Sequence, residues 1–149
     1  MKVEIEVDTN INETIVKIKT NKVTEEIQVL ADKIQNVSNS KNVVASEDNK
    51  LHILNFDDIE SIYSSGGKVI VRKDNKEYIS KKRLYEFEEI LEQNYKNYIR
   101  ISNSEIVNFK KVNSLDLSIT GTIELVFKSG YITYVSRRNI KRIKEYLKI

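Results

Sequence analysis

The spacing of apolar residues changes within the first 35 residues of the chain, from every second position to the spacing of a helix. Residues 3–8 alternate between apolar and acidic side chains, and this period of two predicts a half-buried strand. A second strand is predicted over residues 15–20. After Thr24, a residue able to cap a helix, apolar side chains recur at helical spacing at positions 27, 30, 31 and 34. The predicted β-β-α unit of about 35 residues is too small to be stable alone, so it must pack on the rest of the chain or on a second copy.

A stretch rich in Ser, Asn and Lys, residues 36–42, predicts a linker, and a series of short β segments follows it. Asp57-Asp58, Ser64-Ser65-Gly66-Gly67 and Asp74-Asn75 are turn signals with the spacing of an antiparallel meander. Two helices are predicted, one over residues 82–94 with Ser80 as its cap and one after Ser136 as its cap. Strands are predicted at 51–54, 59–63, 69–71, 78–79, 98–101, 105–109, 115–119, 123–128 and 131–135.

The composition excludes several classes of function because it lacks particular residues and segments. The chain has no cysteine, which excludes disulfides, thiol catalysis and cysteine-based zinc sites. No apolar run approaches the roughly 20 residues that span a membrane, and the N-terminus does not resemble a signal peptide. We therefore expect a cytoplasmic protein.

Groups able to carry catalysis are also scarce. The single histidine, His52, stands in an apolar segment without an acidic residue two positions away, which favours a structural or surface role. The acidic residues at 57, 58 and 60 are better explained by a turn than by a metal site. The Gly66-Gly67 segment lacks the Lys-Ser/Thr pair and the helix of a phosphate-binding loop. We predict no enzymatic activity, no metal, no cofactor and no small-molecule substrate.

Charge is divided unevenly along the chain. Residues 1–94 hold 14 Lys/Arg against 18 Asp/Glu, a balance of −4, whereas residues 95–149 hold 11 against 4, a balance of +7. The basic last third indicates a polyanionic partner, although a solvated basic face that contacts nothing explains the charge equally well. Arg137 and Arg138 would oppose the dipole in the first turn of the closing helix, which favours a negatively charged partner.

One segment, residues 98–108, resembles the signature of the LytTR DNA-binding family. The family typically shows an aromatic residue, an arginine, a strand, a serine and then Val-Asn, and this chain has Tyr98, Arg100, Ser104 and Val107-Asn108. Three further segments resemble the family in the same order. Residues 58–62 resemble its opening Asp-Ile strand, residues 84–91 its central helix and residues 136–139 its Ser-Arg-Arg segment. The resemblance covers residues 43–149.

The resemblance implies a mainly β (α+β) fold, an elongated stack of small antiparallel β-sheets with two short helices, here preceded by the β-β-α unit. It divides the chain into residues 1–42, an N-terminal unit for dimerisation or docking, and residues 43–149, a DNA-binding domain. The implied function is sequence-specific binding of double-stranded DNA in transcription regulation. Loops between strands, rather than the last helix, would then enter the DNA grooves.

By the same resemblance, base contacts fall on Asn103, which suits adenine, and on Arg138, which suits guanine. The third family contact lies in the first hairpin and is often His or Asn. This chain has Gly66-Gly67-Lys68 there, so Lys68 contacts either a base or only phosphate. Family members usually have a histidine at the position before Asn103, where this chain has Ser102. Phosphate contacts or loop support are expected from Arg100, Ser104, Asn108, Lys110, Lys111, Arg137, Asn139, Lys141 and Arg142.

The resemblance also bears on regulation and partners. Residues 1–42 are too short for the receiver domain that many family members carry, so control by phosphorylation is not expected. Small stand-alone members are often paired with an inhibitory membrane protein, and a homodimer on direct repeats is expected. Two other interpretations remain: a protein-interaction module with a basic face, and an RNA-binding protein, although aromatic platforms for RNA bases are not apparent.

Overall fold

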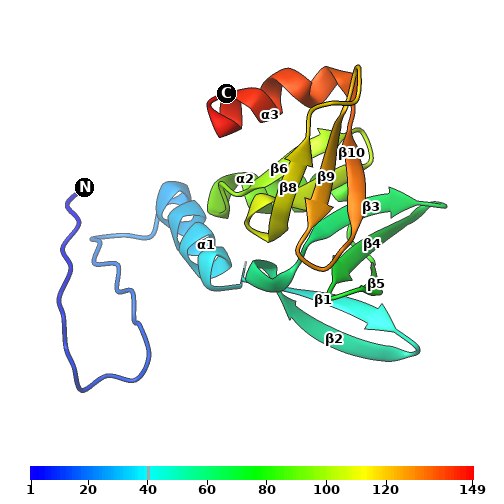
Figure 1. Cartoon of the computed structure of the whole chain (residues 1–149). Helices are drawn as coiled ribbons and strands as arrows, with labels where there is room; N and C mark the ends of the chain where they lie inside the picture. The colour runs from blue at the N-terminus through cyan, green and yellow to red at the C-terminus, as the bar shows by residue number, and fades with distance from the viewer. Residues whose placement is uncertain (40) are drawn as a thin grey trace. The chain divides into compact units, whose positions relative to one another are not determined.

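The computed structural model describes residues 1–39 and 41–149, which fall into two compact units, Met1–Ser38 and Asn39–Ile149 (Figure 1). In the first unit, residues 1–24 form neither helix nor strand, and the helix α1 (Glu25–Asn39) follows them. The predicted helix is confirmed together with its cap, because the Thr24 hydroxyl accepts a hydrogen bond from the Ile27 amide at 3.3 Å.

The two strands predicted over residues 3–8 and 15–20 are wrong for this chain. Neither segment has the backbone ladder that defines a strand. An alternating pattern supplies a strand face, but a strand forms only when a neighbouring segment takes up its N–H and C=O groups. The predicted linker at 36–42 is also wrong for most of its length, since α1 continues to Asn39 and a strand begins at Asn42. Residue 40 lies outside the described residues.

The larger sheet of the second unit is built from seven short strands. Across the sheet their order is β2-β1-β5-β4-β3-β7-β6, and all neighbours are antiparallel. The predicted meander is confirmed for the segments at 59–63, 69–71 and 78–79, but the segment at 51–54 pairs with an additional strand, β1, so Asp57-Asp58 is not a hairpin turn. The strands are β1 (Asn42–Glu47), β2 (Lys50–Asn55), β3 (Ser61–Ser65), β4 (Lys68–Lys73), β5 (Lys76–Ser80), β6 (Tyr98–Ser102) and β7 (Glu105–Asn108).

Three hairpins of this sheet close through two-residue turns, Asp48-Asn49, Gly66-Gly67 and Asp74-Asn75. Both residues of each turn have a positive φ, between 47° and 76°. This conformation belongs to the type I′ turn, whose twist matches that of the flanking strands and which Gly, Asn and Asp tolerate best. The turn residues of the sequence therefore fix the register of the hairpins.

The helix α2 (Leu84–Asn94) covers one face of the larger sheet. Its Phe87 and Leu91 pack into a core with Phe56, Ile62 and Val71, all of them buried. The predicted cap at Ser80 is wrong, because the helix begins only after Arg83, whose amide donates to the Glu86 carboxylate at 3.0 Å. The Ser80 hydroxyl instead accepts from the Lys82 amide in the connection that leads to the helix.

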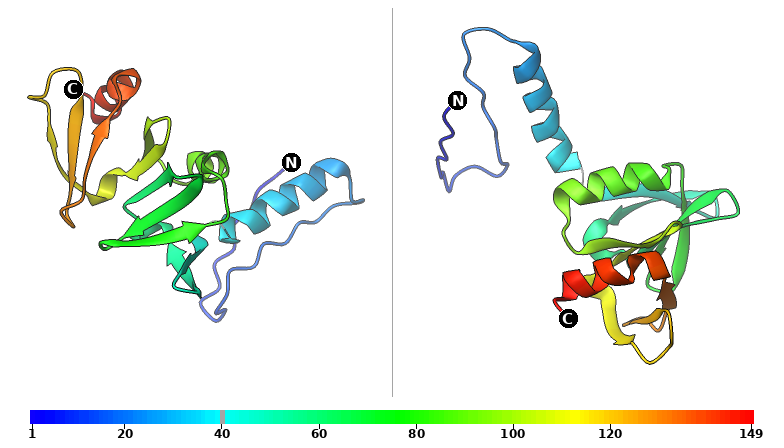
Figure 2. Two further views of the ribbon diagram at one scale, coloured as in Figure 1. Left: turned by 90° about the vertical axis from the view of Figure 1, so that its right-hand side faces the viewer. Right: turned by 90° about the horizontal axis from the view of Figure 1, so that it is seen from above.

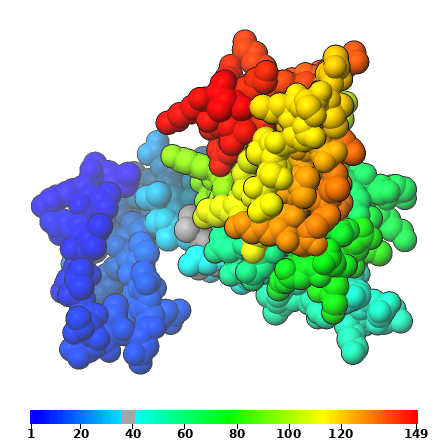
Figure 3. Space-filling model, viewed as in Figure 1, coloured from blue at the N-terminus to red at the C-terminus, as the bar shows by residue number. Residues whose placement is uncertain are grey.

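A smaller sheet is formed by β8 (Val112–Asp116), β9 (Ile123–Phe127) and β10 (Ile132–Val135), in the order β10-β9-β8. With the closing helix α3 (Ile140–Leu147) it surrounds a second core that includes Leu125, Phe127 and Ile143, and Ile101 of β6 and Val107 of β7 belong to the same core. Strands β6 and β7 therefore join the two sheets into one unit. In the space-filling view of Figure 3, residues of the smaller sheet and α3, coloured yellow to red, pack against those of the larger sheet, coloured green. The mainly β fold is confirmed. No helix within residues 1–39 and 41–149 has the length and apolar character needed to span a membrane.

Candidate nucleic-acid interface

The turn between β6 and β7 exposes Asn103 and Ser104 and is held by an arginine. The guanidinium of Arg100 donates through Nε to the carbonyl oxygen of Ser102 at 2.9 Å and through Nη2 to that of Asn103. Its Nη1 pairs with the carboxylate of Glu88 on α2. Since all three nitrogens of the guanidinium are engaged, Arg100 supports the turn. Of the two roles predicted for it, loop support is the one that its contacts match.

Two backbone hydrogen bonds attach other loops to this turn. The Ser64 amide donates to the Ser104 carbonyl at 2.8 Å and ties the β3–β4 hairpin to it. The Ser136 amide donates to the Ile101 carbonyl at 2.8 Å and ties the segment before α3 to it. Residues 64–68, 102–104 and 136–139 thus lie together at one edge of the second unit, which we call the loop edge; the left view of Figure 2 faces the side of the molecule where these strand ends lie.

All three residues predicted to contact bases stand on the loop edge with exposed side chains. They are Lys68 at the start of β4, Asn103 in the β6–β7 turn and Arg138 before α3. The hairpin tip beside Lys68 is bare, because no atom lies within 4 Å of the places where Cβ atoms would stand at Gly66 and Gly67. A backbone without side chains allows a close approach by another molecule.

The segment that carries Arg138 differs from its prediction. Arg137–Asn139 form a 3-10 turn, η3, and α3 begins only at Ile140. Ser136 is therefore not the cap of the closing helix. Arg137 and Arg138 do not lie in its first turn, so they do not oppose its dipole as predicted. Asn139 shapes η3, because its side-chain amide donates to the Ser136 hydroxyl at 2.7 Å.

The loop between β8 and β9 also reaches the loop edge, although nothing in the sequence predicted it there. The side chain of Arg137 lies against Gly121, where an added Cβ would stand 3.0 Å from its Nε. Gly121 has a φ of +82°, a conformation that side-chain-bearing residues rarely adopt. A glycine within the Ser/Thr-rich stretch 118–122 was the available signal.

Two lysines on the loop edge were missed as well. The β4–β5 register pairs Val69 with Ser80, so residue 81 stands beside Lys68 at the same end of the sheet. Lys81 and Lys82 are both exposed. The division of charge along the chain drew attention to the last third, whereas antiparallel pairing brings these earlier lysines to the same edge.

Three predicted residues, Asn108, Lys110 and Lys111, lie away from the loop edge, at or just after the opposite end of β7. The Asn108 side chain is fully buried: it donates to the Ile59 carbonyl at 2.9 Å and accepts from the Asn97 side chain at 2.6 Å. It also accepts from the Lys110 amide at 3.0 Å, so it supports the 3-10 turn η2 (Phe109–Lys111). Lys110 and Lys111 belong to that turn and are separated from Asn103 by the length of β7.

The two basic residues predicted on α3 have different surroundings. Lys141 is exposed in the first turn, directly after η3. Arg142 lines a hollow of about 400 Å³ together with Arg100 and the carboxylate residues Glu88, Glu92 and Glu145. Carboxylates at this position compete with phosphate for the arginine, so the surroundings of Arg142 do not favour a DNA contact.

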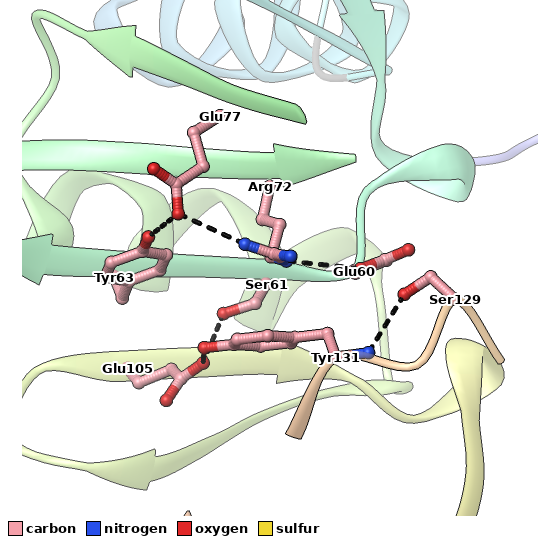
Figure 4. Close-up of polar contacts among 8 residues, drawn as sticks. All are labelled: Glu60, Ser61, Tyr63, Arg72, Glu77, Glu105, Ser129 and Tyr131. Atoms are coloured by element: carbon pink, nitrogen blue, oxygen red, sulfur yellow. Dashed lines mark hydrogen bonds and ion pairs between the residues drawn. The ribbon is translucent and has the colours of Figure 1, made fainter. Parts of the chain in front are cut away.

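A buried polar cluster lies directly behind the β6–β7 turn (Figure 4). The carboxylate of Glu105, which follows Ser104, accepts hydrogen bonds from the hydroxyls of Ser61 at 2.5 Å, Tyr131 at 3.0 Å and Thr133 at 2.5 Å. Ser61 belongs to the larger sheet, whereas Tyr131 and Thr133 belong to the β9–β10 hairpin. Glu105 therefore fixes the turn to both sheets at once.

The same cluster continues along the larger sheet. The Arg72 guanidinium lies 4.2 Å from the centre of the Tyr131 ring and donates to Glu77 at 3.1 Å. The hydroxyl of Tyr63 donates to the same carboxylate at 2.5 Å. Burial is the main cause and this hydrogen bond the second cause that raise the pKa of Tyr63 to about 12. Burial and the neighbouring Glu105 also raise the pKa of Tyr131.

Among the described residues, no group of three or more His, Cys, Asp or Glu side chains could hold a metal ion. His52 is half-buried in β2, with its Nε2 3.6 Å from the Glu47 carboxylate. The arrangement at the loop edge, exposed amide and cationic side chains on rigidly held loops, is suited to contacts with an anionic polymer.

Comparison with known proteins gives a consistent result. The family described as LytTr DNA-binding domain matches residues 49–148. Uncharacterized HTH-type transcriptional regulators of Staphylococcus aureus strains COL and MW2 are 33% and 32% identical over 149 residues, covering 100% of this chain and 99% of each relative. A solved LytTr DNA-binding domain from Bacillus cereus is similar in fold, with a TM-score of 0.68 and 20% identity, over 73% of this chain and 98% of that one.

Proposed function

Because the chain belongs to the LytTR DNA-binding domain family, we propose that it regulates transcription by binding double-stranded DNA sequence-specifically through the loop edge. One observation supports this most directly: the hydrogen bonds Ser64–Ser104 and Ser136–Ile101 join three loops that carry exposed Lys68, Asn103 and Arg138. Among the described residues, strands separate the α-helices, so no two of them form the helix-turn-helix unit that presents a recognition helix. Loops of the loop edge are therefore the proposed elements that enter the grooves.

The side chains of the loop edge divide into two roles. Asn103 contacts adenine and Arg138 contacts guanine, because each can form two hydrogen bonds with that base in the major groove. Lys68 mainly contacts phosphate, because its side chain has no amide group with which to distinguish adenine. The other exposed cations of the edge hold the backbone of the duplex and set the position of the protein on it: Lys81, Lys82, Arg137 and Lys141.

Selection of bound duplexes from a random pool, followed by affinity measurements across salt concentrations, tests the proposal. We expect one preferred sequence and an affinity that falls linearly with salt on logarithmic scales, with a slope of roughly −4 to −5 for five neutralised phosphates. A preference for RNA or for an acidic protein over every duplex would contradict it, and those outcomes would favour the RNA-binding or protein-interaction interpretation.

We also propose that the protein acts as a cytoplasmic, non-enzymatic homodimer on direct repeats and that an inhibitory membrane protein controls it. Support for such a partner comes from an uncovered apolar surface on the larger sheet, where Val44, Leu51, Ile53 and Ile79 are 54%, 75%, 76% and 42% exposed. Contiguous exposed apolar surface is typical of protein-binding sites. Co-purification of membrane proteins with the wild-type chain and with an Ile53→Lys variant tests this, and equal capture by both would contradict the use of this surface.

A further inference from the structure

Residues 1–35 of the unit Met1–Ser38 form no core of their own. Among residues 1–35, no side chain is buried. Hydrophobic burial is the main force that holds a folded unit together, and this unit leaves its apolar side chains in water. The exposed large apolar residues are Met1, Val3, Ile5, Val7, Ile11, Ile15, Val16, Val23 and Val29.

Within this unit the two segments that precede α1 face a common hollow. Residues 1–4, residues 16–20 and one side of α1 line a space of about 750 Å³. Figure 1 shows the first segment turning back toward the second, yet no backbone hydrogen bond joins them. Both segments therefore offer free N–H and C=O groups, which a neighbouring strand can take up.

The two segments carry opposite charges on alternating positions. The first has Glu4, Glu6 and Asp8 between its apolar residues, and the second has Lys17 and Lys19, with Lys22 shortly after. In paired antiparallel strands, side chains of one face lie directly opposite each other, and opposite charges there stabilise the pair. The acidic segment of one chain is thus complementary to the basic segment of another.

We propose that two copies of this chain associate through residues 1–38 by exchanging strands, residues 3–8 of each copy pairing with residues 15–20 of the other. The inference deepens the homodimer proposed above by giving it an interface. A two-fold axis makes both pairings at once, and a self-complementary surface of this kind closes at two copies. Stable interfaces take about 20–30 residues from each partner, which this unit can supply.

Strand exchange also accounts for the half-buried apolar side of α1. Ile27, Leu30 and Ile34 face the hollow and are only partly covered. Strands from the partner, with their valines and isoleucines toward α1, would close the hollow and create a core that belongs to both copies. The failed strand prediction for residues 3–8 and 15–20 has the same explanation, because the partner that completes these strands is the second copy.

Two charge-reversed variants of the full chain test the proposal. One carries Glu4→Lys and Glu6→Lys, the other Lys17→Glu and Lys19→Glu. Sedimentation velocity is expected to show a wild-type dimer and a dimer dissociation constant raised about tenfold or more in each variant alone, because like charges then oppose each other in both pairs. In an equimolar mixture of the two variants, both strand pairs again bring Lys opposite Glu, and dimers are expected to return.

The mixture separates exchange between chains from pairing within one chain. If residues 3–8 paired with residues 15–20 of their own chain, mixing could not restore what each variant lost, and this result would overturn the proposal. A monomeric wild-type chain, or single variants that dimerise as well as the wild type, would overturn it too. A variant with Glu13→Lys and Glu25→Lys has the same change of charge outside both segments and is expected to remain dimeric.

Binding to a duplex with a single half-site keeps this test apart from the proposed function. We expect the charge-reversed variant Glu4→Lys, Glu6→Lys to bind that duplex as tightly as the Glu13→Lys, Glu25→Lys control, since the loop edge is unchanged. A wild-type chain that binds the half-site duplex but is monomeric, or whose dimer is unaffected by either charge reversal, would overturn only this inference. A wild-type chain that binds no duplex would instead contradict the proposed function.

Discussion

Arg138 and Arg142 are four residues apart, yet their surroundings differ in charge. Arg138 is exposed on the loop edge, whereas Arg142 lines a hollow with three glutamates. An arginine that reaches guanine makes two hydrogen bonds, which are lost together when its side chain is removed. The two positions therefore form a natural pair of test and control.

We predict that Arg138→Ala weakens binding to the selected sequence by about 1–3 kcal/mol and relaxes the preference at one base pair. Arg142→Ala is expected to change neither quantity appreciably. Fluorescence anisotropy with the selected duplex and with single-base variants of it measures both effects. Equal weakening of all duplexes by Arg138→Ala would show that this residue contacts phosphate instead.

Asn108 has the opposite character, since its side chain is 0% exposed and its three hydrogen bonds stay inside the protein. We predict that Asn108→Ala lowers the free energy of unfolding by about 1–3 kcal/mol, because the Ile59 carbonyl and the Lys110 amide lose their partner. Urea denaturation measures this, with the exposed Asn103→Ala as control. Unchanged stability combined with lost DNA binding would contradict the structural role.

The family motif located both asparagines, but it could not assign their roles. Asn103 and Asn108 are five residues apart in a turn and the strand that follows it, and burial alone distinguishes them. Burial of Asn108 depends on Ile59 and Asn97, which approach it from other elements. A local sequence pattern holds no information on such contacts, so residue roles were less predictable than residue positions.

At the scale of elements, β4 carries a lysine at each end. Lys68 stands at the loop edge, and Lys73 lies at the opposite end near Asp58. We predict that Lys68→Ala weakens binding to all duplexes alike and reduces the magnitude of the salt slope by about 1, because one phosphate contact is lost. Lys73→Ala is the control and is expected to leave the slope unchanged. A change in base preference on Lys68→Ala would instead indicate a base contact.

Most strands of the second unit could be predicted because turn residues such as Gly66-Gly67 and Asp74-Asn75 mark their ends. Helix starts were less predictable. Ser80 and Ser136 have the right side chains for caps, but Ser80 is the last residue of β5 and Ser136 lies one step before a 3-10 turn. Hydrogen bonds with Lys82 and Asn139 occupy their hydroxyls, and each helix begins about four residues later.

At the scale of the whole second unit, the polar cluster behind the loop edge joins the two sheets and makes stability depend on pH. Tyr63 has its pKa raised from the usual 10 to about 12, so the folded state disfavours its ionisation. The contribution of Tyr63 is therefore complete below pH 10 and is lost as pH rises toward 12. We predict a fall in melting temperature over that window that is smaller in Tyr63→Phe. An equal fall in both proteins would contradict a role for Tyr63.

The sequence alone did not predict the hydrogen bonds that bring the three loops together at the loop edge. It depends on the bonds Ser64–Ser104 and Ile101–Ser136, which join residues far apart along the chain. The family motif predicted that Asn103 and Arg138 belong to the DNA-binding surface. The position of Lys81 and Lys82 beside Lys68 follows only from the register of β4 and β5. Pairings between distant segments decide which residues share an edge, and these pairings are set by the packing of both sheets.

The contact between Gly121 and Arg137 has a consequence for the evolution of such proteins. A side chain at position 121 would need a φ of +82° and would displace the guanidinium of Arg137. The φ of +82° favours retention of glycine at 121 whatever residue stands at 137, and where the glycine is lost, a shorter residue at 137 would remove the close contact. Because Arg137 is proposed to hold the duplex backbone and not a base, we expect covariation of positions 121 and 137 to record changes in how the protein sits on DNA, separate from changes in base preference.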